Sequence, residues 1–105
     1  MNTIVITGAT SGIGFETARV LTQRGFNVLG VSRSEDNCNR AKERILSEKS
    51  DAKITFFVAD LMQQREVIRV AEEIVLYLNE YCNRELYALI NNVGCVRSWY
   101  MTTEE

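Results

Sequence analysis

The sequence has no histidine, no proline and only three cysteines among its 105 residues. Without histidine, no Ser-His or Cys-His nucleophile arrangement can form. Cys38, Cys82 and Cys95 are widely separated and make no Cys-x-x-Cys pair, which argues against a zinc site. An odd number of separated cysteines is typical of free thiols in a reducing compartment. We therefore expect no metal centre and a cytoplasmic location.

Long apolar runs and strong net charge are also lacking. No stretch of eighteen apolar residues occurs, so no membrane span is expected, and residues 1–3 lead into a strand without the features of a signal peptide. The formal net charge of -2 argues against a nucleic-acid partner. With 46% hydrophobic and 25% charged residues, the composition is that of a globular protein, and residues 1–105 are expected to form one domain.

Short apolar segments alternate with amphipathic ones along the whole chain. The pattern predicts strands at residues 4–6, 27–31, 53–59 and 86–91, and helices at 14–24, 34–50 and 63–82. Gly25 is expected to end the first helix in a left-handed conformation. The third helix is expected to bury a broad apolar stripe made of Val67, Val70, Ala71, Ile74, Val75 and Leu78. Uninterrupted alternation predicts a three-layer α/β/α fold with a parallel sheet in the order 3-2-1-4.

The turn after the first strand reads Thr-Gly-Ala-Thr-Ser-Gly-Ile-Gly, from Thr7 to Gly14. Gly8 allows a backbone angle that a Cβ would disfavour, Gly12 lets a phosphate approach the main chain, and Gly14 lets the helix pack closely on the strand. The helix that follows directs unpaired N–H groups and the positive end of its dipole above this turn. A pyrophosphate fits there, and a purely steric role for the glycines is the alternative.

The spacing Thr-Gly-x-x-x-Gly-x-Gly resembles the glycine-rich signature of the short-chain dehydrogenase/reductase family and matches it at every fixed position. The resemblance implies a Rossmann-type fold that binds a nicotinamide dinucleotide. In complete members it implies hydride transfer between the nicotinamide and a carbonyl or alcohol carbon. The cofactor contacts predicted in this turn are Gly8, Thr10, Ser11, Gly12, Ile13 and Gly14.

Ser32 and Arg33 follow the second strand and bear on the choice between NAD and NADP. Dinucleotide folds that use NAD usually carry Asp or Glu in this region, which accepts hydrogen bonds from the ribose hydroxyls. A guanidinium instead pairs with a 2′-phosphate, and a serine hydroxyl can donate to it. The sequence therefore favours NADP over NAD. The alternative is that Arg33 is a solvated loop charge, and Glu35 and Asp36 lie nearby.

Two further segments resemble the family at the ends of the third and fourth strands. The resemblance implies that Asp60 meets the adenine amino group and that the backbone of Leu61 helps to hold the ring. Capping of the next helix by Asp60 is the alternative. Asn91-Asn92-Val93-Gly94 is similar to the Asn-Asn-Ala-Gly segment of the family, which borders the adenine ribose. Asn91, Val93 and Gly94 are therefore predicted cofactor contacts, although Asn and Gly also favour plain turns.

The catalytic residues of the family are missing. The resemblance implies a catalytic Ser and a Tyr-x-x-x-Lys motif, but no tyrosine here has Lys four residues later, and all three lysines precede the tyrosines. The chain therefore resembles the N-terminal, cofactor-binding half of a reductase, truncated after the fourth strand, where Thr102 and Glu105 form a capping-box pattern. We expect it to bind the dinucleotide without hydride transfer. A non-catalytic nucleotide-sensing or protein-interaction module is the alternative.

An exposed fourth strand is the expected consequence of this truncation. Apolar side chains along and after that strand should form an exposed apolar surface that favours association: Tyr87, Leu89, Ile90, Val93, Val96, Trp99 and Met101. We expect a dimer or larger homo-oligomer that buries it. The substrate pocket would lie in the missing half.

Overall fold

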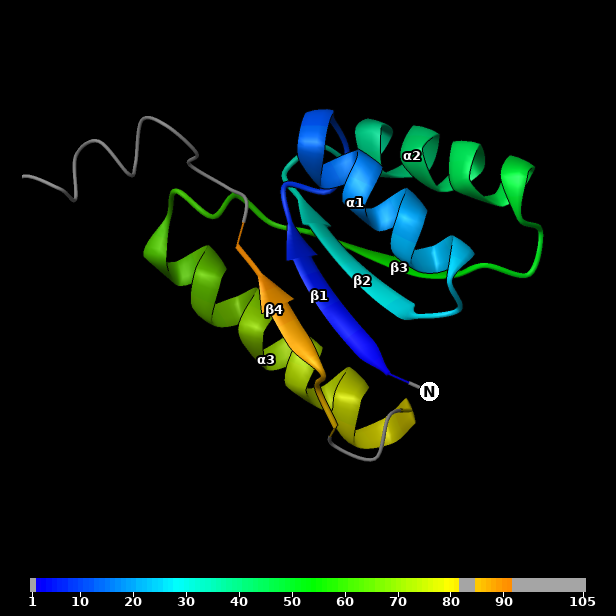
Figure 1. Cartoon of the computed structure of the whole chain (residues 1–105). Helices are drawn as coiled ribbons and strands as arrows, with labels where there is room; N and C mark the ends of the chain where they lie inside the picture. The colour runs from blue at the N-terminus through cyan, green and yellow to red at the C-terminus, as the bar shows by residue number, and fades with distance from the viewer. Residues whose placement is uncertain (1, 82–84, 92–105) are drawn as a thin grey trace, which may run out of the picture.

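The computed structural model describes residues 2–81 and 85–91 and has three layers (Figure 1). The element order is β1 (Thr3–Thr7), α1 (Gly12–Gln23), β2 (Asn27–Ser32), α2 (Glu35–Glu48), β3 (Lys53–Val58), α3 (Gln64–Tyr81) and β4 (Ala88–Ile90). The four strands are parallel and lie in the order β3-β2-β1-β4. The predicted fold class and topology are therefore confirmed.

Successive residues of the central strands supply two separate cores. On one face of the sheet, Ile4 and Ile6 of β1 pack with Phe15 of α1 and Ile45 of α2. On the other face, Val5 packs in a cluster with residues of β2 and with Val70 and Leu78 of α3. This alternation follows from the two-residue period of a strand. Figure 1 accordingly shows α1 and α2 on one side of the sheet and α3 on the other.

Gly30, in the middle of β2, has no room for a side chain on the sheet face that α1 and α2 cover. A Cβ added at Gly30 would lie 2.5 Å from Cε1 of Phe56 in β3 and 3.1 Å from the Cβ of Ala9. The Phe56 ring therefore occupies the space above Gly30, against the turn that follows β1. The sequence pattern of β2 did not reveal this close approach.

The helix ends follow the predicted capping chemistry. Gly25 has φ of 92°, and the amide of Phe26 donates to the carbonyl of Leu21, 3.1 Å away, which closes the end of α1. Ser34 caps α2 by accepting a hydrogen bond from the amide of Asn37 at 3.2 Å. The predicted end of α1 at Gly25 is confirmed.

Three expectations about the elements were wrong in detail. α1 begins at Gly12, two residues earlier than predicted, and β4 covers only Ala88–Ile90. The apolar stripe of α3 is only partly buried, because Val67 and Val75 remain 41% and 53% exposed. Their side chains line a groove between α3 and β4, which no described element covers.

Several predicted residues lie outside the part of the chain that the structure describes. They are Cys82, Asn92, Val93, Gly94, Cys95, Val96, Trp99, Tyr100, Met101, Thr102 and Glu105. Within residues 2–81 and 85–91, no helix combines the length and the apolar character that crossing a membrane requires.

Candidate functional site

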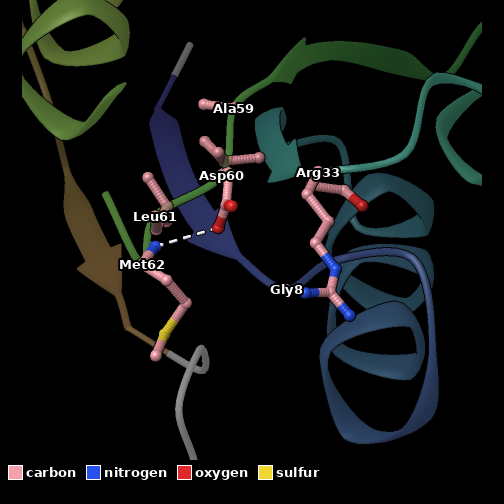
Figure 2. A pocket seen from close by; sticks show the side chains of 8 residues that line it. Gly8, Arg33, Ala59, Asp60, Leu61 and Met62 are labelled. Atoms are coloured by element: carbon pink, nitrogen blue, oxygen red, sulfur yellow. Dashed lines mark hydrogen bonds between the residues drawn. The ribbon is translucent and has the colours of Figure 1, made fainter. Parts of the chain in front are cut away.

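The carboxyl ends of β1, β2 and β3 surround a cavity of about 300 Å³. In a parallel sheet this edge is the usual place for a ligand, beside the point where the strand order reverses. The cavity is lined by Gly8, Val31, Ser32, Arg33, Ala59, Asp60, Leu61 and Met62. Figure 2 shows Arg33 on one side of this cavity and Asp60, Leu61 and Met62 on the other. Five predicted site residues are thus brought together, from three different strand ends.

The turn after β1 has the backbone geometry that its glycines allow. Gly8 and Gly12 have φ of 65° and 57°, in the left-handed region that side chains disfavour. The amide of Gly8 donates to the carbonyl of Val31 at 2.8 Å, which fixes the turn against β2. A Cβ added at Gly12 would meet nothing within 4 Å, so the main chain there is open to a ligand.

The amino end of α1 is left open, in contrast to that of α2. Ser11 occupies the N-cap position in an extended conformation, but its side chain makes no capping hydrogen bond. No acidic residue lies in the first turn of α1, whereas α2 has a bonded serine cap followed by Glu35 and Asp36. The free N–H groups and the dipole of α1 therefore suit an anion. Ile13 is exposed in this first turn and Gly14 is buried.

Ser32 connects the glycine turn to the end of β2. Its Oγ lies 3.2 Å from Oγ1 of Thr10, within hydrogen-bonding distance, and accepts from the amide of Ser34 at 3.4 Å. Burial raises the pKa of the neighbouring Cys38 thiol, and a hydrogen bond with Ser32 opposes that rise. The contacts give Ser32 a defined orientation at the edge of the cavity.

Arg33 is exposed, and none of the ion pairs within residues 2–81 and 85–91 involves it. Neither Glu35 nor Asp36 neutralises its guanidinium, although both are close in sequence. The planar donor group therefore remains available at the cavity for a phosphate, with which guanidinium pairs well.

The carboxylate of Asp60 closes the turn between β3 and α3. Its Oδ1 accepts from the amide of Met62 at 3.0 Å, and its Oδ2 accepts from Nε2 of Gln63 at 3.3 Å. Both donors, Met62 and Gln63, come before Gln64, where α3 begins. The Asp60 carboxylate therefore does not cap the amides in the first turn of α3. Each carboxylate oxygen can accept more than one hydrogen bond. Asp60 can therefore still accept from a ligand amino group at the cavity.

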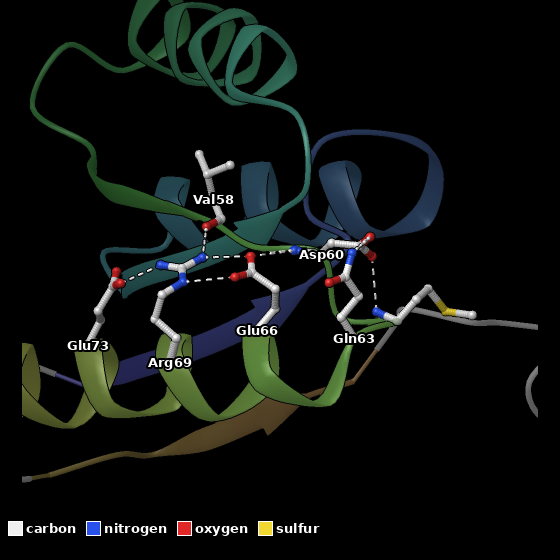
Figure 3. A network of polar contacts seen from close by, with 7 residues as sticks. Val58, Asp60, Gln63, Glu66, Arg69 and Glu73 are labelled. Carbon is white, nitrogen blue, oxygen red and sulfur yellow. Dashed lines mark hydrogen bonds and ion pairs between the residues drawn. The ribbon is translucent and has the colours of Figure 1, made fainter.

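A group of charged side chains on α3 lies behind this turn (Figure 3). The guanidinium of Arg69 donates to Glu66 through two nitrogens, at 3.1 Å and 2.9 Å, and also bonds to Glu73. Sequence reasoning missed this group as part of the site. The spacing of Glu66, Arg69 and Glu73 indicates helical ion pairs, but it does not reveal which backbone atoms the group reaches.

Asn91 lies apart from the cavity, at the end of β4. Its Oδ1 accepts from Oγ1 of Thr7 at 2.9 Å, which ties β4 to the end of β1. It also lines the groove of about 480 Å³ between α3 and β4. Val93 and Gly94, the other predicted contacts from this segment, lie outside the described residues.

The arrangement can bind several polar groups of one ligand. It combines open amides, one guanidinium and one carboxylate, which match a diphosphate, a further phosphate and an amino group respectively. Among the described residues, no group of three or more Cys, Asp or Glu side chains could hold a metal ion.

Comparison with known proteins gives consistent matches. A family model described as short chain dehydrogenase matches residues 2–105. A WW domain-containing oxidoreductase of Danio rerio is 33% identical over 102 residues, which are 96% of this chain and 24% of that protein. The chloroplastic short-chain dehydrogenase TIC 32 A of Brassica napus is 36% identical over 103 residues, which are 98% of this chain and 31% of that protein.

Solved structures agree with these matches. YwfH, described as an NADPH dependent reductase involved in bacilysin biosynthesis, matches with a TM-score of 0.74 and 29% identity. The match covers 88% of this chain and 37% of that one. The chain thus spans about a quarter to a third of the length of the two curated relatives described above.

Proposed function

Because the chain belongs to the short-chain dehydrogenase family, we propose that it is the cofactor-binding portion of an NADP-dependent oxidoreductase. Residues 1–105 then belong to a dinucleotide-binding domain. NADPH, when bound to a complete enzyme of this kind, supplies a hydride to a carbonyl carbon. The residues of this chain bind and orient the dinucleotide for that transfer.

Each part of the dinucleotide has a matching group in this proposal. The open amides of residues 9–14, with Thr10 and Ser11, hold the diphosphate beside Gly8, and Arg33 with Ser32 holds the 2′-phosphate. Asp60 and Leu61 hold the adenine, while Asn91, Val93 and Gly94 border its ribose. The single observation that carries the proposal is that the Arg33 guanidinium, which forms no ion pair with the other described residues, lines one cavity with Gly8 and Asp60.

The choice of NADP over NAD is tested by an Arg33→Ala variant, with Arg40→Ala of α2 as a matched control on another exposed arginine. Fluorescence titration should show NADP⁺ affinity falling about tenfold to a hundredfold in Arg33→Ala, since a charged hydrogen-bonded contact is lost. Affinity for NAD⁺ should change by about twofold or less, and Arg40→Ala should bind both as the unchanged chain does. Equal losses for the two dinucleotides in Arg33→Ala would refute the assignment.

Hydride transfer by this chain alone is not part of the proposal. None of its tyrosines is followed four residues later by lysine, so the proton transfer of the family lacks its donor. The purified chain should bind NADPH but leave it unoxidised in the presence of ketones and aldehydes. Enzyme-dependent loss of NADPH absorbance would contradict this expectation.

A second candidate function is protein interaction through the groove between α3 and β4. Among the described residues β4 pairs only with β1, and the groove beside it is lined mostly by apolar side chains. Leu86 and Leu89 are 43% and 62% exposed there. We propose that a second copy of this chain covers the surface, giving a dimer.

We also propose a cytoplasmic location, on the basis of the separated cysteines.

A further inference from the structure

The carbonyl of Val58 marks the point at which β3 leaves the sheet. Among the described strands β3 lies at the edge of the sheet, so a carbonyl that faces away from β2 has no strand partner among them. Nη2 of Arg69, one layer below on α3, donates to the oxygen of Val58 at 2.8 Å. The same nitrogen lies 2.9 Å from Oε1 of Glu66, so one guanidinium joins the strand end to the helix.

Glu66 extends this connection to the next part of the backbone. Its Oε1 accepts from the amide of Asp60 at 3.4 Å, a long hydrogen bond. Among the described residues, the last backbone bond of this segment to the sheet is made by the amide of Ala59, which donates to the carbonyl of Ser32 at 2.9 Å. Beyond Ala59, the backbone of Asp60 is therefore held from outside its own turn by Glu66, which Arg69 orients through a two-point contact.

We propose that Glu66 and Arg69 are positioning residues for the adenine subsite, holding Asp60 at the cavity without touching the ligand themselves. The inference rests on the proposed function, in which Asp60 accepts from the adenine amino group. Figure 3 shows that the charged side chains extend from α3 to the backbone of Val58 and Asp60. The carboxylate of Asp60 makes separate contacts, among them the hydrogen bond that it accepts from the amide of Met62.

The chain contains a matched group that serves as a control. Arg19 on α1 bonds to Glu16, three residues before it, at 2.8 Å, and to Glu48 of α2 at 3.2 Å. It has the same side-chain chemistry as the Arg69 group. However, no contact of Arg19 reaches the cavity, whose lining residues belong to other segments.

The experiment compares NADP⁺ with its hypoxanthine analogue, in which an oxo group replaces the adenine amino group. The unchanged chain should bind NADP⁺ about tenfold more tightly than the analogue, because the oxo group cannot donate to Asp60 as the adenine amino group does. In Glu66→Gln and Arg69→Gln this ratio should fall at least about threefold, mainly by weaker binding of NADP⁺. Arg19→Gln should keep the ratio of the unchanged chain.

Amide hydrogen exchange of the ligand-free chains provides the second measurement. The amide of Asp60 should exchange several-fold faster in Glu66→Gln and Arg69→Gln than in the unchanged chain, and not in Arg19→Gln. Glu66→Gln keeps the size of the side chain, so it serves if Arg69→Gln fails to fold.

The possible failures are distinguishable. If the unchanged chain binds neither dinucleotide, the proposed function is wrong and this inference falls with it. If the unchanged chain binds NADP⁺ with a clear preference for adenine, but the Glu66 and Arg69 variants keep both the preference and the slow exchange of Asp60, the positioning role alone is wrong.

Discussion

Gly12 and Gly25 provide a matched pair for separating backbone strain from ligand contact. Both have positive φ, 57° and 92°, and a Cβ at either position would meet nothing within 4 Å. Alanine should therefore destabilise the fold by about 1–2 kcal/mol at either position, because the left-handed region is disfavoured for it. Only Gly12→Ala places its methyl group where the proposal puts a phosphate.

The expected result is a similar loss of melting temperature in Gly12→Ala and Gly25→Ala, with very different binding. NADP⁺ affinity should fall about tenfold or more in Gly12→Ala, because close approach of the phosphate to the main chain is lost. It should stay near that of the unchanged chain in Gly25→Ala. Full affinity in a folded Gly12→Ala variant would rule out a phosphate over this turn.

The pKa of Glu66 gives a prediction about acid. Hydrogen bonds from Arg69 hold the pKa of this carboxyl below its ordinary value of 4.5. A group with a lower pKa in the folded chain stabilises the fold above its unfolded value, and this contribution is lost as pH falls through the folded value. Both side chains keep contact with solvent, so the effect is small and weakened by salt.

Thermal melting of the unchanged chain and of Glu66→Gln at low salt tests whether the stabilisation by Glu66 is lost in acid. The unchanged chain should be the more stable of the two near pH 6, and its advantage should disappear as the pH falls below the ordinary pKa of 4.5. An advantage that stays constant or grows in acid would contradict the pairing of Glu66 with Arg69.

At this scale the sequence predicted what depends on local chemistry. The conformations of Gly8 and Gly25, and the capping bond of Ser34, follow from interactions within a few residues. The contact of Arg69 with the carbonyl of Val58 joins residues eleven apart, on a helix and a strand in different layers. Such a contact depends on how α3 lies on the sheet, which the pattern of α3 does not specify.

At the scale of elements, β2 and β3 fit together through Gly30. A methyl group at this position would contact the Phe56 ring at 2.5 Å and Ala9 at 3.1 Å. Gly30→Ala should therefore destabilise the chain by about 1–3 kcal/mol, as overpacking of a core usually does. Denaturant unfolding measures the loss.

A double variant tests whether Phe56 is the cause. Phe56→Leu removes the ring that lies above Gly30, so adding Ala at position 30 should cost less in that background than alone. If the two changes add without interaction, the contact with Phe56 is not what requires glycine.

The elements themselves were largely predictable, and the exceptions in α3 and β4 have a common origin. β2 is a continuous apolar segment and is buried along almost its whole length, as a central parallel strand should be. β4 pairs only with β1 among the described residues and is shorter than its apolar sequence predicts. The exposed Val67 and Val75 on α3 line the groove beside β4. Among the described residues no element covers this groove, so part of the expected apolar stripe of α3 stays exposed.

At the scale of the whole molecule, this groove should govern association. Leu89 is 62% exposed on β4 and lines the groove. Leu89→Lys should shift a dimer towards monomer in sedimentation measurements, because a charge would be buried in an apolar contact. Ile13→Lys, which changes an apolar residue 78% exposed on α1, is the control and should leave the association state unchanged. A monomer at high concentration in the unchanged chain would refute the proposed dimer.

The central claim is that the carboxyl edge of β1, β2 and β3 holds the dinucleotide. The most direct measurement is the change in backbone amide NMR signals as NADP⁺ is added to the unchanged chain. Binding at this edge should give the largest changes in residues 8–14, 32–33 and 60–62, with little change along the outer face of α2. Saturable binding that perturbs other residues and leaves these three segments unaffected would contradict it.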